Sequence, residues 1–86
     1  MIYINHKNPN ELYVYLKSLK NFLYLIKNRI NSRYSENEIK PYMIMLTNII
    51  TYHLPYLQFL YDKKIERDIV VELLDLIYYL RYFAKT

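Results

Sequence analysis

His53 is the side chain of this sequence best suited to chemistry, because an imidazole can bind a metal ion or transfer a proton near neutral pH. It lies between Pro41 and Tyr61, a stretch without Asp, Glu, Lys or Arg. The other histidine, His6, is distant in sequence and no carboxylate lies three or four residues from His53, so no local metal site is expected. A neutral imidazole on an apolar face must form a hydrogen bond or lose about 1–3 kcal/mol on desolvation. We interpret His53 as a hydrogen-bonded core residue; the alternative is a ligand or acid–base role in a small polar pocket.

The sequence contains no motif for other kinds of catalytic site. The chain has no Cys and no Gly, which removes thiol nucleophiles and glycine-rich phosphate loops. Ser18, Ser32 and Ser35 have no histidine close in sequence. Glu72 and Asp75 share a predicted helical face, where such carboxylates are usually solvated or salt-bridged. The sequence predicts a protein that is not an enzyme and that uses no cofactor or metal.

A basic stripe with interleaved tyrosines follows the predicted first helix. Its spacing is 4-3-4-3-4, and its members are Tyr13, Lys17, Lys20, Tyr24, Lys27 and Asn31. Lysines on such a face can contact successive phosphates, and tyrosines can bind phosphate or stack on bases. With two arginines near the helix end, the candidate surface for nucleic acid or another partner is Tyr13, Lys17, Lys20, Tyr24, Lys27, Arg29 and Arg33.

An acidic stripe of matching period offers a different explanation for these lysines. It lies on the predicted last helix and consists of Asp68, Glu72, Asp75, Tyr79 and Tyr82. The two stripes could pair within one chain or across a dimer, which would set register more than stability, since exposed ion pairs contribute only about 0–1 kcal/mol each. We favour helical pairing or plain solvation over nucleic-acid binding.

The size and composition indicate one small domain that associates with itself. At 86 residues the chain buries only about 60–65% of its unfolded surface, and without Cys it cannot be stabilised by disulfides or thiolate zinc sites. Its twelve tyrosines suit half-buried surfaces and interfaces. The net charge of +4 favours anionic partners, and the basic excess lies in the predicted first helix, where Glu11 is the only acidic residue.

The residue usage also suggests a source and a compartment. Gly is absent, and Ile, Asn, Lys and Tyr, all with AT-rich codons, are abundant. The composition resembles that of small proteins from viruses and plasmids of thermophilic archaea, although no motif is shared. The N-terminal sequence has none of the features of a signal peptide, so we expect the cytoplasm, either the host cytoplasm or a virion if the gene is viral.

Capping signals divide the chain into three predicted helices, over residues 9–33, 36–61 and 63–85. Asn8 and Ser35 are predicted N-caps of the first two, each with a Glu three residues later, and Asp62 is a weaker cap for the third. The apolar residues of each helix form a stripe with helical period. The predicted fold is all-α: a single domain over residues 1–86, a three-helix antiparallel bundle that forms a dimer.

The segment before the first helix, residues 1–8, reads as a short extended N-terminal arm. Its β-branched and aromatic residues suit an extended conformation, and a single strand is unstable without partners. It could pack on its own bundle or reach a second subunit, and both alternatives stay open.

The predicted middle helix is long enough to span a membrane, but it contains too many polar residues for a membrane span. Polar residues interrupt the stretch between Pro41 and Tyr61, and its apolar residues fall into two adjacent stripes, which is typical of a buried helix. Pro55 cannot donate to the Thr51 carbonyl, so the helix should kink or break near His53 and Leu54. The second, tyrosine-rich stripe is the candidate dimer interface: Tyr42, Met45, Ile49, Tyr52, Tyr56 and Phe59.

The sequence thus favours a non-enzymatic protein–protein interaction module that self-associates, encoded by a virus or mobile element. The first alternative is sequence-independent nucleic-acid binding through the basic stripe. The second is membrane association, for which we find little support.

Overall fold

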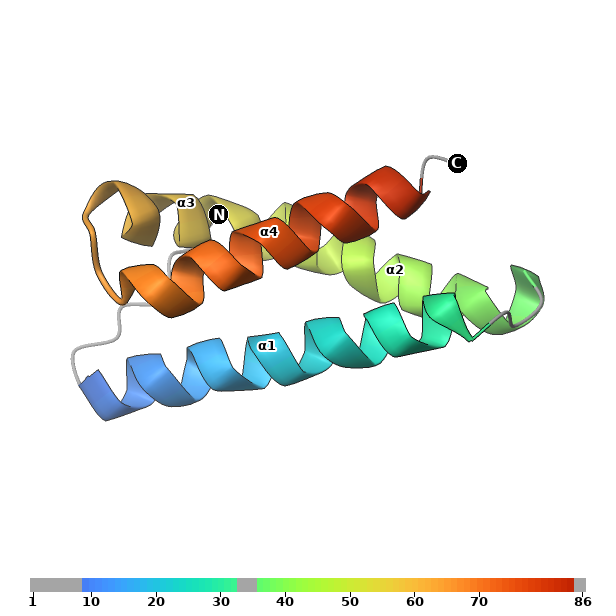
Figure 1. The fold of residues 1–86 in the computed structure, drawn as a ribbon, viewed down its shortest axis with the longest axis horizontal. Coiled ribbons are helices and arrows are strands. Elements are labelled where there is room, and N and C mark those ends of the chain that lie inside the picture. Colours follow the sequence, from blue (N-terminus) through green and yellow to red (C-terminus); the bar gives the residue numbers. More distant parts are fainter. Residues whose placement is uncertain (1–8, 33–35, 85–86) are drawn as a thin grey trace.

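The computed structural model describes residues 9–32 and 36–84, which form four α-helices (Figure 1). They are α1 (Pro9–Asn31), α2 (Glu36–Tyr52), α3 (Leu54–Asp62) and α4 (Arg67–Ala84). The all-α prediction is confirmed, and the described residues contain no strand. The three-helix bundle is wrong, because the predicted middle helix is two helices. The predicted arm at residues 1–8 lies outside the described residues, and so do Asn8 and Ser35, the predicted N-caps of the first and second helices.

The middle helix is interrupted at His53, where Pro55 predicts a break. Pro55 lies in the first turn of α3 and has no N–H to donate to the Thr51 carbonyl. The His53 N–H still closes α2 by donating to the Ile49 carbonyl at 2.8 Å, and the His53 carbonyl accepts from Leu57 at 3.0 Å, which starts α3. One residue therefore ends one helix and begins the next.

The second interruption, over residues 63–66, lies where the sequence predicts a boundary at Asp62, but it is longer than predicted. Ile65 N–H donates to the Leu60 carbonyl at 3.0 Å and Lys64 N–H donates to the Tyr61 carbonyl at 3.1 Å. With Lys64 in the left-handed region at φ 59°, this is the Schellman closure that usually uses glycine. Because the chain has no glycine, a lysine takes the position.

This closure corrects two predictions about the last helix. Asp62 is the final residue of α3 and does not cap the next helix. The last helix begins at Arg67 rather than at 63, because Lys64 and Glu66 both have positive φ and cannot continue a right-handed helix. The Glu66 carbonyl then accepts the N–H of Val70 at 3.0 Å and opens the ladder of α4.

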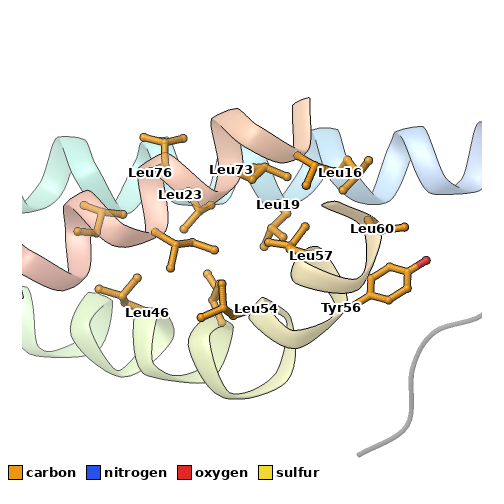
Figure 2. Packing of buried hydrophobic residues seen from close by; sticks show 14 of the residues in the cluster. Leu16, Leu19, Leu23, Leu46, Leu54, Tyr56, Leu57, Leu60, Leu73 and Leu76 are labelled. Atoms are coloured by element: carbon orange, nitrogen blue, oxygen red, sulfur yellow. The ribbon is translucent and has the colours of Figure 1, made fainter. Parts of the chain in front are cut away.

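Helix α4 packs against the other three helices, lies alongside α1 and completes the core (Figure 1). The buried residues come from every helix, and the side chains with less than 2% exposure are Leu16, Leu23, Ile26, Leu46, Leu57, Leu60, Val70, Leu73, Ile77 and Leu80. Figure 2 shows leucines of all four helices around one centre, with the Tyr56 ring at its edge and the hydroxyl pointing away. The apolar stripe predicted for the first helix, here called the leucine stripe, thus meets the apolar side of α4 in a single cluster. The leucine stripe consists of Leu12, Leu16, Leu19, Leu23, Ile26 and Ile30.

Over the described residues, no helix combines the length and apolar content that a membrane crossing requires.

Candidate functional site

An open groove lies between α1 and α2. Its volume is about 370 Å³. The side chains that line it are Tyr15, Ser18, Leu19 and Phe22 from α1, and Met45, Asn48, Ile49, Tyr52 and His53 from α2 and its end. Leu19 and Ile49 are buried, whereas Phe22 is 44% exposed and Tyr52 is 62% exposed. The groove therefore has an apolar floor and half-open aromatic walls.

Tyr15 and His53 form a hydrogen bond at one part of this groove. The Tyr15 hydroxyl lies 2.8 Å from His53 Nδ1, and the two rings are tilted by 43° with centroids 5.6 Å apart. Tyr56 completes the cluster: its ring and that of Tyr15 are in an edge-to-face arrangement, with their centroids 5.7 Å apart. The hydrogen bond ties the turn between α2 and α3 to α1.

Burial changes the acid–base properties of this cluster. It lowers the pKa of His53, because the charged imidazolium form loses part of its hydration. Burial, and then the neighbouring Tyr56, raise the pKa of Tyr15 to about 12. Both groups are therefore neutral at physiological pH. The expected hydrogen bond of His53 is present, but its side chain is half-buried and does not belong to the core. The alternative pocket role is also visible, since His53 lines the groove.

The basic stripe of α1 meets the acidic stripe of α4 at Glu72. Lys20 Nζ lies 3.0 Å from Glu72 Oε1, and the Tyr24 hydroxyl donates to Glu72 Oε2 at 2.9 Å. The Lys27 ammonium lies 5.2 Å from the centre of the Tyr79 ring, in a cation–π contact. Three members of the candidate nucleic-acid surface therefore contact α4 instead of being presented together to solvent.

The charges of this network shift one another's ionisation. Hydrogen bonds from Lys20 and then Tyr24 lower the pKa of Glu72. The same hydrogen bonds raise the pKa of Lys20 and of Tyr24. Both charged groups are thus stabilised in their ionised forms, and Tyr24 in its neutral form.

The remaining residues of the predicted basic surface are dispersed. Tyr13 and Lys17 are exposed near one end of α1, where the Lys17 ammonium lies over the Tyr13 ring at 5.8 Å. The Arg29 guanidinium lies over the Tyr42 ring at 5.7 Å, toward α2. Arg33 is outside the described residues. The six described residues are thus divided among contacts with α4, a contact with α2 and exposed positions near one end of α1.

No protein-family model matches the chain, and no curated protein or solved structure matches it either.

The predicted dimer stripe of the middle helix is divided by the fold. Ile49 and Tyr56 are buried in the core at 6% and 8% exposure, and Tyr42 and Met45 pack partly against it. Only Tyr52 and Phe59 keep large exposed surfaces. The break at His53 lies between these two, so they belong to different helices, α2 and α3.

The sequence analysis missed the α1 side of the groove. Val14, Phe22 and Leu25 are large apolar residues of α1 that stay outside the leucine stripe, and they are 61%, 44% and 41% exposed. Their apolar nature, together with the absence of charge on this face of α1 between Glu11 and Arg29, was the signal available in the sequence. We use the name uncharged face for the groove together with Val14, Asn21, Leu25 and Ile44.

The described residues contain no cluster of three or more metal-binding side chains. They also contain no buried side-chain nitrogen or oxygen that lacks a hydrogen-bond partner.

Proposed function

We propose that this protein is a non-enzymatic helical interaction module that associates with a second copy of itself. The observation that carries the proposal is the uncharged face. Five large apolar side chains are exposed on it, and they are Val14, Phe22, Leu25, Ile44 and Tyr52. Apolar patches of this kind mark protein interaction sites, and charged residues are depleted at the centres of interfaces.

The small size of the chain supports the same proposal. A domain of 86 residues buries a limited fraction of its surface, and this one has no Cys with which to form stabilising disulfides. A second subunit that covers the uncharged face would add apolar burial at about 25 cal/mol for each Å² removed from water.

Size-exclusion chromatography with light scattering tests the proposal directly. At micromolar concentration we expect a mass near twice 10.7 kDa. A monodisperse monomer over that concentration range would contradict it.

Nucleic-acid binding is left with weaker support, because Glu72 engages both Lys20 and Tyr24. Replacing Lys17, Lys20 and Lys27 with Glu separates the two functions. Binding that weakens steeply with added salt and is lost in this variant would favour nucleic acid. The origin in a virus or mobile element and the cytoplasmic location stay predictions that this proposal includes.

A further inference from the structure

A row of exposed side chains on α1 runs beside the groove. It consists of Val14, Ser18, Asn21, Phe22 and Leu25, and two of these, Ser18 and Phe22, also line the groove. The row therefore presents a ridge and a groove next to each other on one surface. Such a surface can pair with a copy of itself, because in a twofold-symmetric interface each partner gives and receives the same contacts.

The two ends of this row carry opposite charges. Glu11 is exposed one turn before Val14, and Arg29 is half-buried one turn after Leu25, with its guanidinium over Tyr42. On an antiparallel copy of α1, residue numbers that add to 39 or 40 lie opposite each other. Val14 then faces the second copy's Leu25, and Glu11 faces its Arg29.

We propose that two chains associate with their α1 helices antiparallel, about a twofold axis near Leu19 and Lys20, and with their uncharged faces in contact. This inference rests on the proposed function and names the surface and orientation that it would use. Phe22 of one copy covers the second copy's Ser18 at the edge of the groove. Ser18 is small, so the aromatic ring meets no bulky side chain there.

The charge pattern is the argument for a second copy as the occupant and for this orientation. A parallel arrangement about a twofold axis places Glu11 beside Glu11 and Arg29 beside Arg29, which repel each other. The antiparallel arrangement pairs them with opposite sign at both ends, and the row of side chains between them has no charged member. Rim charges of this kind select orientation and register more than they add affinity.

Single cysteines test the arrangement, because the natural chain contains none. Chains with Val14→Cys and chains with Leu25→Cys, carrying different affinity tags, are mixed and mildly oxidised. Disulfides require Cα atoms within about 7 Å, whereas two Val14 positions on antiparallel helices lie about 16 Å apart along the axis. We expect disulfides between the two kinds of chain and few within either kind.

A matched control uses Tyr82→Cys, at a position on α4 that is 72% exposed and away from the proposed surface. This variant is expected to stay reduced at the same protein concentration. Light scattering on each reduced variant shows whether it is dimeric before oxidation. Phe22→Lys adds a second measurement, since a lysine at the interface should dissociate the dimer while circular dichroism shows the helices intact.

The outcomes separate the two proposals. Disulfides that join one Val14→Cys chain to another, with none between Val14→Cys and Leu25→Cys chains, would show parallel pairing and overturn the orientation. A dimer that links through Tyr82→Cys, or that survives Phe22→Lys, would place the interface elsewhere while self-association stands. A chain that is monomeric before any substitution would overturn both.

Discussion

The Lys20 ammonium on α1 and the Glu72 carboxylate on α4 are 3.0 Å apart, and they join the predicted basic and acidic stripes within one chain. The Tyr24 hydroxyl binds the other oxygen of the same carboxylate. A single glutamate thus satisfies two residues of α1, one helical turn apart. This relationship links α1 to α4 and engages two residues of the predicted basic surface.

The Lys20–Glu72 contact predicts energetic coupling between the two helices. Lys20→Met and Glu72→Gln should each lower the midpoint of thermal unfolding by no more than about 5 °C, because partly exposed ion pairs stabilise weakly. The double variant should lose less than the sum of the two losses. Asp75→Asn, one turn along α4 at an exposed position, is the control and should show no coupling with Lys20→Met.

The lowered pKa of Glu72 predicts a loss of stability in acid. A carboxyl group with a lower pKa in the folded state stabilises the fold fully above its unfolded-state pKa. That stabilisation disappears as the pH falls through the folded-state value. Glu72→Gln should therefore flatten the acid limb of a stability curve measured by chemical denaturation at pH 2–6. An acid limb identical to that of the natural protein would contradict the assignment.

The lowered pKa of His53 predicts a second pH dependence, nearer to neutrality. The folded state resists protonation of the buried imidazole, so stability is complete above the ordinary histidine pKa and falls as the pH drops toward the folded-state value. His53→Asn keeps a polar atom for Tyr15. The free energy of unfolding of this variant should change less with pH between about pH 7 and pH 5 than that of the natural protein. His6 is present in both proteins, so it cancels in the comparison.

The hydroxyl of Tyr15 can be tested separately from its ring. Tyr15→Phe removes the hydrogen bond to His53 and keeps the aromatic contacts with His53 and Tyr56. We expect a loss of about 1 kcal/mol in the free energy of unfolding, measured with urea. Tyr13→Phe, at an exposed position two residues earlier, is the matched control. Equal effects of the two substitutions would argue against the Tyr15–His53 bond.

The left-handed conformation of Lys64 predicts that glycine does not destabilise the fold at position 64 but does so at position 63. A non-glycine residue at φ 59° carries a steric cost of about 1–2 kcal/mol, which glycine avoids. Lys64→Gly should unfold at the same or a higher temperature than the natural protein. Lys63→Gly, where φ is −84°, should unfold at a lower temperature, because glycine only adds flexibility there. The reverse order would show that the Schellman closure is wrong.

The helical class of this protein and the main parts of its core could be predicted from the sequence. The leucines of α1 recur at helical spacing and are buried, because burying apolar surface is the largest favourable term in folding. Pro55 also marked the break at His53, since a missing N–H and a ring clash are local effects. Such properties depend on residues close together in the chain.

The sequence could not predict what depends on contacts between distant residues. Lys64 has no local preference for a left-handed conformation, so the turn after α3 was not predicted and the last helix was started too early. The middle helix offered two apolar stripes, and only packing against α1 and α4 decided that Tyr56 is buried while Tyr52 is exposed.

The same division holds for the candidate site. Residue types and spacing alone determined that α1 has a basic face and a leucine face, because helical periodicity assigns each side chain a direction. Tertiary structure decided that Glu72 lies against Lys20 and Tyr24, and that Phe22 and Tyr52 form the walls of one groove. These pairs come from different helices, and their approach depends on how the whole core packs.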